Sequence, residues 1–396
     1  MKNYNQDPKP SALKFIFLLG IVSLLADITY EGARSITGPY LALLGASGTI
    51  VGIVAGFGEL VGYGLRVVFG YLSDRTGRYW LMTILGYTIN LLAVPLLALA
   101  GHWEIAAVLM ISERIGKAIR TPSRDAMLSL ATKEIGRGWG FGLHEAMDQI
   151  GAMLGPLIIA LVLALKGGYK FSFAILLIPA LLALTILFVA RYLYPKPRDL
   201  EPSSAPIATK GFPRLFWLYL LAVALVAFGY VDFPLIAYHF KKVAVVSDNW
   251  IPIFYALAMG VDAIAALLFG RLFDRLGVIT LVFAVLLSSI FAPLLFLGKF
   301  YLAMLGMVLW GVGIGAQESI MRAAIANMIP INKRGQAYGI FNGFYGLFWF
   351  LGSALLGIFY DRSIPVLIAF SVISQLTSIP FFLSLRKQRN KGALPL

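Results

Sequence analysis

Apolar stretches of about 20 residues recur along the whole chain, and this recurrence limits what the chain can fold into. A helix of that length crosses the hydrocarbon core of a bilayer, which is roughly 30 Å thick. Only 13% of the 396 residues are charged, whereas soluble domains carry about 25%. The sequence therefore predicts an all-α polytopic membrane protein. The twelve predicted transmembrane helices cover residues 13–43, 47–70, 78–100, 103–130, 139–165, 170–193, 214–239, 248–270, 278–298, 300–325, 336–360 and 364–385.

One long polar segment interrupts this series. It reads "YPKPRDLEPSSAPIATKGFPR" and follows the sixth apolar stretch. We therefore expect an N-terminal six-helix half over residues 1–193, a cytoplasmic linker over 194–213 and a C-terminal six-helix half over 214–396.

The distribution of Lys and Arg predicts the orientation, because positively charged loops stay on the cytoplasmic side of a membrane. With both termini in the cytoplasm, most of the 33 Lys and Arg residues fall in cytoplasmic segments. The net charge of +14 reflects this bias, so nucleic acid is not an expected partner. The first span has no small-residue cleavage site before it, and we expect no removed signal peptide. The outward loops hold Lys166, Lys170, Lys241, Lys242, Lys299 and Arg362.

A short charged motif at the end of the second stretch appears twice. "GYLSDRTGR" begins at residue 70 and "GRLFDRLG" begins 200 residues later. A second pair, "RGWGFGLHEAMDQIGAMLGP" and "RGQAYGIFNGFYGLFWFLGS", also aligns between the halves. Two homologous, pseudo-symmetric halves follow from these repeats. The motif residues are Gly70, Asp74, Arg75, Gly77 and Arg78 in the first copy and Gly270, Asp274, Arg275 and Gly277 in the second.

The first copy resembles the signature between helices two and three of the major facilitator superfamily (MFS) of secondary transporters, Gly-x-x-x-Asp-Arg/Lys-x-Gly-Arg-Arg/Lys. Tyr79 stands where the last basic residue is expected. The resemblance covers essentially the whole chain, and the stretch "ERIGKAIRTPSRDAML" is similar to a bacterial branch of the superfamily. It implies the MFS fold, alternating access and a multi-pass place in the bacterial plasma (inner) membrane.

The same resemblance implies a gating role for the repeated motif. Asp74 is expected near the start of helix eleven at Gly335, and Asp274 near the start of helix five at Gly138. The N-terminus of a helix is partly positive and attracts a carboxylate, so both contacts would stabilise a closed cytoplasmic side. The alternative is a cytoplasmic turn that carries positive charge and has no gating role, but this does not explain the repeated glycines and aspartate.

Helix five resembles the antiporter signature of the superfamily, Gly-x8-Gly-x3-Gly-Pro. Ile159 and Ala160 replace its closing glycine pair. Glycines at this spacing allow close helix packing, and proline bends a helix. The matching residues, which predict a bend, are Gly142, Gly151, Gly155 and Pro156.

Ionisable residues within the apolar stretches are functional candidates, because burying an unpaired charge in a membrane is costly. The N-terminal half has six such acids against four cations, which leaves one or two carboxyl groups to hold protons. A purely structural network remains the alternative. The predicted proton-coupling residues are Asp27, Glu31, Glu113, Glu145 and Asp148, and the cations are Arg34, Arg66, Arg114 and Lys117.

The C-terminal half offers aromatic residues with a few hydrogen-bonding groups, a composition typical of small-molecule pockets. Packing or contact with lipid is the alternative role of these rings. The predicted substrate-binding residues are Arg34, Arg114, Trp310, Gln317, Glu318, Asn342 and Tyr345.

Enzyme chemistry has little support in the sequence. The three histidines are scattered, there is no cysteine, and no phosphate-binding Gly-Lys loop is present. We expect no enzyme, no ATP-driven pump, no cofactor and no metal. A monomeric, proton-coupled exporter of a small organic solute is the leading hypothesis. The alternatives are a proton symporter that imports an organic anion, with Arg34 or Arg114 as ligand, and a lysolipid or lipid carrier.

Overall fold

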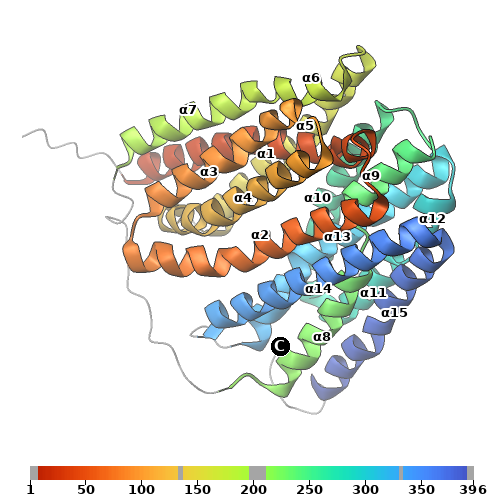
Figure 1. Ribbon diagram of the computed structural model, residues 1–396. Coiled ribbons are helices and arrows are strands. Elements are labelled where there is room, and N and C mark those ends of the chain that lie inside the picture. The colour runs from red at the N-terminus through yellow and green to blue at the C-terminus, as the bar shows by residue number, and fades with distance from the viewer. Residues whose placement is uncertain (1–7, 133–136, 196–210, 330–332, 390–396) are drawn as a thin grey trace, which may run out of the picture. The chain divides into compact units, whose positions relative to one another are not determined.

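The computed structural model describes residues 8–132, 137–195, 211–329 and 333–389, and all regular structure in these ranges is helical (Figure 1). The prediction of an all-α fold is confirmed. The helices are α1 (Pro8–Leu43), α2 (Gly48–Thr76), α3 (Tyr79–Leu96), η1 (Leu97–Leu99), α4 (Trp103–Thr132), α5 (Arg137–Ala164), α6 (Gly168–Ile175), α7 (Leu177–Leu193), α8 (Arg214–Gly229), α9 (Phe233–Lys242), α10 (Trp250–Leu276), α11 (Ile279–Ser288), α12 (Phe291–Leu297), α13 (Phe300–Met328), α14 (Arg334–Arg362) and α15 (Ile364–Arg389).

Eleven helical segments of the described chain are long and apolar enough to cross a membrane. Four of them join two shorter helices each, namely α3 with η1, α6 with α7, α8 with α9 and α11 with α12. The remaining helix, α4, has 30 residues and is therefore about 45 Å long. It is long enough to span the bilayer, but seven charged side chains make it less apolar than the others.

The span of α8 and α9 is interrupted at residues 230–232, where a continuous helix over 214–239 was predicted. Pro234 lies in the first turn of α9, a position that suits proline because the amide groups there have no helical partner. The interruption leaves backbone groups that need other partners inside a membrane. Trp310 Nε1 donates to the carbonyl of Val231 at 2.9 Å, and the Tyr230 hydroxyl donates to the carbonyl of Trp310.

The chain forms two compact units. The first comprises residues 1–33, 65–100 and 104–204, and the second comprises residues 34–64, 101–103 and 205–396. Both α1 and α2 therefore contribute to each unit. The predicted division into halves at the linker remains a prediction, and most of that linker lies outside the described residues.

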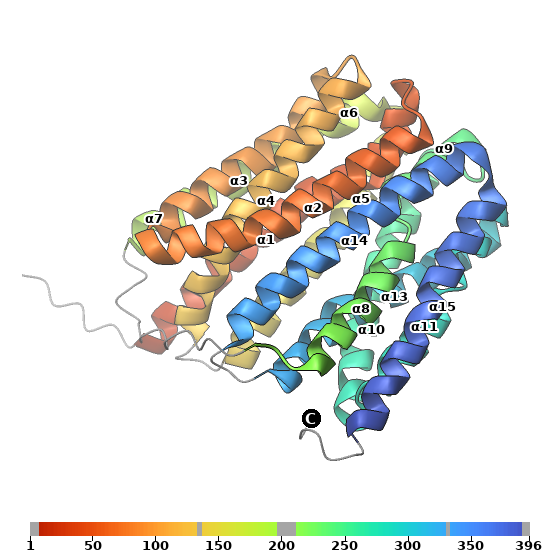
Figure 2. The ribbon, with the colours of Figure 1, turned by 60° about the horizontal axis from the view of Figure 1, so that its bottom comes forward.

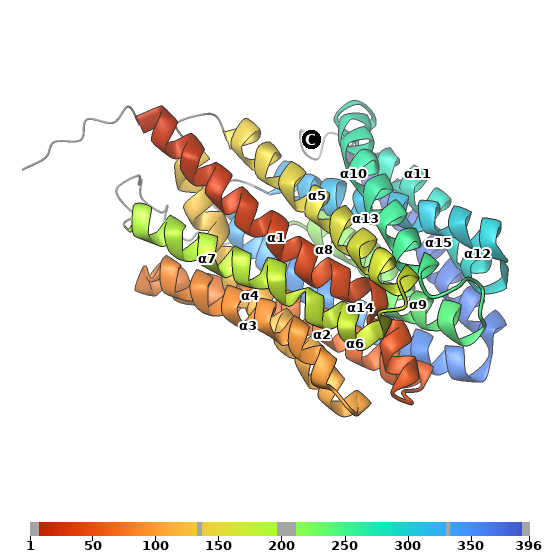
Figure 3. The ribbon, with the colours of Figure 1, turned by 90° about the horizontal axis from the view of Figure 1, so that it is seen from above.

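Close backbone contacts hold the helices of each unit together. In the first unit, α1 and α5 run side by side (Figure 3), with Gly155 against Gly32. In the second unit, α8 lies between α14 and α15 (Figure 2), with Gly352 against Phe228 and Gly229 against Ser371. Small residues allow this approach, since helix association in lipid depends on packing rather than on the hydrophobic effect.

The repeated charged motif ends a helix in the same way in both copies. Gly77 follows α2 with φ +65°, and Gly277 follows α10 with φ +63°. Their amides donate to the carbonyls of Ser73 and Phe273, each at 2.7 Å. This left-handed cap favours glycine, which explains why the motif repeats a glycine at this position.

Candidate functional site

The helix-five glycines differ in what they touch. A Cβ atom on Gly151 would collide with the carbonyl of Leu24 and lie 2.9 Å from Cβ of Asp27. Gly155 is packed equally closely against Ile28 and Gly32, and Pro156 follows it within α5. Gly142 has no atom near its Cβ position. Two of the glycines therefore bring α5 directly beside the acidic face of α1.

The acids on that face of α1 lie beside basic residues of α4. The exposed fractions of Asp27 and Glu31 are only 5% and 7%. Lys117 Nζ lies 4.0 Å from Glu31 Oε1 and 3.9 Å from the centre of the Tyr30 ring. Asp27 interacts electrostatically with Lys117 and with Arg120, which is 1% exposed. We call Asp27, Glu31, Lys117, Arg120, Arg124 and Asp148 the acid–base cluster.

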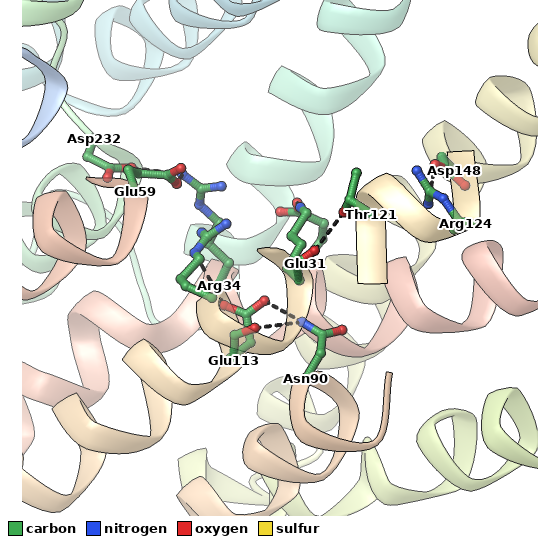
Figure 4. Close-up of polar contacts among 11 residues, drawn as sticks. Glu31, Arg34, Glu59, Asn90, Glu113, Thr121, Arg124, Asp148 and Asp232 are labelled. Atoms are coloured by element: carbon green, nitrogen blue, oxygen red, sulfur yellow. Dashed lines mark hydrogen bonds and ion pairs between the residues drawn. The ribbon is translucent and has the colours of Figure 1, made fainter. Parts of the chain in front are cut away.

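Within this cluster, Arg124 contacts Asp148 and also two residues outside the cluster. Its Nη1 donates to Ser23 Oγ at 2.9 Å and lies 3.8 Å from Asp148 Oδ2, while Nη2 lies 2.8 Å from Asp125. Figure 4 shows Arg124 beside Asp148. His144 Nδ1 lies 3.5 Å from the same Asp148 oxygen. Asp148 therefore faces a permanent cation and a titratable ring on one side.

Two oxygens of the cluster have no hydrogen-bond partner within the described chain. These are Asp27 Oδ1 and Asp148 Oδ1, and both are buried. An oxygen without a partner is costly when it belongs to a buried carboxylate. The two carboxyl groups also interact electrostatically with each other, so ionising both at once is doubly unfavourable.

The other predicted proton residues lie in different surroundings. Glu113 accepts from Asn90 Nδ2 at 2.7 Å, and its second oxygen lies 3.2 Å from Arg114 Nε (Figure 4). Glu145 is exposed on α5. Sequence reasoning missed Asn90 as a partner, and its polar side chain within an apolar span was the only signal.

Arg34 lies in the second unit at the centre of a separate ionic group (Figure 4). Its Nη2 is 3.1 Å from Glu59 Oε1 and 2.9 Å from Asp232 Oδ1. Asp232, the residue before α9, is 2% exposed and accepts from Trp349 Nε1 at 3.3 Å. The partners of Arg34 were missed by sequence reasoning, because Asp232 is 198 residues away along the chain. We call Arg34, Glu59, Asp232 and Trp349 the Arg34 group.

Among the predicted substrate residues of α13 and α14, one hydrogen bond joins two members of the set. The Tyr345 hydroxyl donates to Gln317 Oε1 at 3.0 Å, and Gln317 Nε2 donates to the Gly313 carbonyl at 3.1 Å. The Tyr345 ring lies 5.4 Å from that of Trp349. Trp310 supports the break between α8 and α9, Asn342 is half-buried, and Glu318 is exposed.

In the gating motif, Asp74 accepts a hydrogen bond from the Tyr79 hydroxyl at 3.2 Å. Tyr79 is the residue that departs from the family signature. The expected contacts of Asp74 with Gly335 and of Asp274 with Gly138 each join residues of different units, and they remain predictions.

One family model matches most of the chain, and sequence relatives and a solved structure are similar to it. The sequence model of the Major Facilitator Superfamily matches residues 19–353 and 215–394. An uncharacterized protein of Mycobacterium tuberculosis is 39% identical over 389 residues, which cover 96% of this chain and 95% of the relative. The multidrug resistance protein MdtH of Proteus mirabilis is 33% identical over 119 residues, 30% of each chain. The solved structure of the nucleoside transporter NupG (D323A mutant) matches with TM-score 0.76 and 12% identity, covering 93% of this chain and 100% of that one.

Proposed function

The chain belongs to the Major Facilitator Superfamily, and on that premise we propose that it exports a small organic solute in exchange for protons. As a family member it is a secondary transporter and a multi-pass membrane protein, and it is not an enzyme. Proton coupling, the direction of transport and the class of solute are the proposed parts.

The acid–base cluster is the observation that carries proton coupling. Asp27 and Asp148 each have a buried oxygen with no hydrogen-bond partner among the described residues. A proton on either carboxyl removes the charge that burial disfavours. The neighbouring cations Lys117 and Arg124 can stabilise the carboxylate once the proton has left. Proton uptake and release at this pair is thus chemically supported.

In this mechanism, Arg124 and His144 act on Asp148 from the same side. Arg124 already has Ser23 and Asp125 as alternative partners, so it does not depend on Asp148 for neutralisation. A protonated Asp148 would weaken the attraction to Arg124 without leaving that guanidinium unpaired. Glu31, Glu113 and Glu145 remain proposed contributors, with Glu113 held most firmly by its two partners.

Export is favoured over import of an organic anion by the arginines. Arg34 contacts two carboxylates and Arg114 contacts Glu113, so an anionic solute would have to displace an existing partner. The partial similarity to a multidrug resistance protein also favours export. The solute is proposed to contact Trp310, Gln317, Glu318, Asn342 and Tyr345 together with the two arginines.

The membrane arrangement is part of the same proposal. Two six-helix halves joined by a cytoplasmic linker, with both termini in the cytoplasm, agree with the distribution of Lys and Arg. The transporter acts as a monomer, and its two halves expose a central site alternately to the two sides of the membrane.

Proton coupling is tested in proteoliposomes that contain a pH-sensitive dye. Tetraphenylphosphonium, benzoate and a lysophospholipid are added outside in separate experiments. Antiport predicts that entry of the transported compound raises the lumenal pH, whereas symport lowers it. We expect the pH change to disappear in Asp27→Asn and Asp148→Asn and to persist in the control Glu104→Gln, which alters an exposed acid of α4.

Each other outcome has a defined meaning. A lumenal pH that falls with benzoate in proteoliposomes, beyond the fall that benzoic acid causes by diffusion into protein-free liposomes, would contradict export and support anion symport. Uptake of radiolabelled compound without any pH change would make the acid–base cluster structural, and uptake of the lysophospholipid alone would favour a lipid carrier.

A further inference from the structure

The C-terminal end of α14 is joined to the N-terminal end of α2 by one carboxylate. Asp361 Oδ1 accepts from the Gly48 amide at 3.0 Å, and Oδ2 accepts from the Thr49 amide at 2.7 Å. The Thr49 hydroxyl also donates to Oδ2 at 2.7 Å. The first amides of a helix have no partner within the helix, and their end carries partial positive charge. The Asp361 carboxylate accepts hydrogen bonds from these amides, and its negative charge balances the partial positive charge of the helix end.

Below this cap, α2 and α14 approach each other at successive turns. A Cβ atom on Gly56 would lie 2.7 Å from Cβ of Ser353, and one on Gly357 would lie 2.6 Å from the Gly48 carbonyl. A side chain on Gly52 would collide with the Ser353 carbonyl. The two helices are therefore in backbone contact along their shared length, and Ser353 is only 1% exposed.

The loop before α2 is held at the same end. The Tyr238 hydroxyl on α9 donates to the carbonyl of Ala46 at 3.0 Å, and Gly38 of α1 packs against Pro234. All these contacts lie within the second unit. They join helices from the two proposed halves at the end where α1, α9 and α14 finish and α2 begins.

We propose that Asp361 is the positioning residue that closes the side of the transporter opposite its Lys- and Arg-rich loops. This inference rests on the proposed alternating access. Opening that side requires α2 to leave α14, which breaks the three hydrogen bonds of Asp361 and exposes Ser353 to water. A carboxylate on a helix N-terminus suits this task, because its attraction is strong at contact and weakens beyond the first turn. The glycines allow the approach, and Asp361 holds it.

Thiol labelling tests the proposal directly, because the chain has no cysteine of its own. Ser353→Cys introduces a single buried thiol between α2 and α14. We measure its reaction rate with a small, charged methanethiosulfonate reagent in purified protein. Adding Asp361→Asn should raise this rate roughly threefold or more, since one favourable helix-end interaction is lost.

Asp248→Asn is the matched control. Asp248 lies in the loop before α10 and pairs with Lys241 at 2.7 Å, so this variant removes the same charge without touching the start of α2. Its labelling rate should equal that of the parent. An equal increase in both variants would mean that general surface charge controls the rate, and would overturn the proposal.

A second, milder variant distinguishes loss of the helix-end contact from general misfolding. Thr49→Val removes one of the three hydrogen bonds and keeps the carboxylate, so its labelling rate should lie between those of the parent and Asp361→Asn. Size-exclusion chromatography identifies any variant that fails to fold. Parental labelling rates in both Thr49→Val and Asp361→Asn would refute the role of Asp361.

The labelling rate needs neither a solute nor a proton gradient, so the two proposals fail separately. Faster labelling of the Asp361→Asn variant without any solute-driven pH change would support the role of Asp361 and refute the proposed proton exchange. Solute-driven proton exchange together with parental labelling of the Asp361→Asn variant would support the transport proposal and refute the role of Asp361.

Discussion

Arg34 neutralises two buried carboxylates at once, and its removal should be costly. Arg34→Ala leaves Glu59 and Asp232 without this cation, and breaking a buried ion pair from one side costs about 3–5 kcal/mol. We expect a large fall in the midpoint of thermal unfolding in detergent. Arg362→Ala, which changes an exposed arginine at the end of α14, should leave the midpoint unchanged.

A double-mutant cycle isolates the pair. Adding Asp232→Asn to Arg34→Ala removes one of the uncompensated charges, so the double variant should be less destabilised than the sum of the single variants. Simple additivity of the two effects would contradict an energetic link between Arg34 and Asp232, whatever their distance in the structure.

Pairings at this scale were the least predictable part of the candidate site. The spacing in the sequence puts Asp27, Glu31 and Arg34 on one helical face, because residues i, i+4 and i+7 share a face. It did not predict that Asp232 is a partner of Arg34, since no local pattern links residues from different spans. Asn90 and Asp361 were missed for the same reason.

At the scale of single helices, the glycines of α5 give a matched pair of variants. Gly151→Ala places a methyl group against the backbone of Leu24, and we expect it to destabilise the protein by ~1–3 kcal/mol, as overpacking commonly does. Gly142→Ala meets open space and should be neutral or stabilising by up to about 1 kcal/mol through helix propensity.

Thermal unfolding of the two variants in the same detergent decides the matter. Equal midpoints for Gly151→Ala and Gly142→Ala would mean that α1 and α5 can separate at no cost, and the close packing of Asp27 against α5 would lose its structural basis.

Helix type and number followed from the sequence more readily than helix continuity. Long apolar stretches predict spanning helices whatever their neighbours are. The break at residues 230–232 depends on a tertiary partner, because Trp310 Nε1 donates to the Val231 carbonyl there. Pro234 was the local signal that could have indicated this break.

For the molecule as a whole, Asp74 and Asp361 are expected to act in opposite directions. Asp74 is predicted to stabilise the closed cytoplasmic side, and Asp361 is proposed to close the other side. In protein carrying Ser353→Cys, Asp74→Asn should therefore slow thiol labelling, whereas Asp361→Asn should accelerate it. The double variant should label at nearly the parental rate.

Two results would contradict this balance. Faster labelling in Asp74→Asn would mean that Asp74 and Asp361 stabilise the same conformation, the one in which Ser353 is buried. A double variant that labels as fast as Asp361→Asn alone would show that Asp74 makes no contribution.

The composition of α4 has a consequence for how the protein is made. Seven charged residues oppose the transfer of this helix into lipid on its own, because each charge near the centre of a span adds about 2.5–3.5 kcal/mol to insertion. Lys117 meets Glu31 of α1, and Glu113 meets Asn90 of α3. Helices α1 and α3 are synthesised first, so we expect them to wait beside the insertion machinery until α4 emerges. We therefore expect biogenesis of this transporter to depend on the assembly of neighbouring helices during translation, rather than on their release into the bilayer one by one.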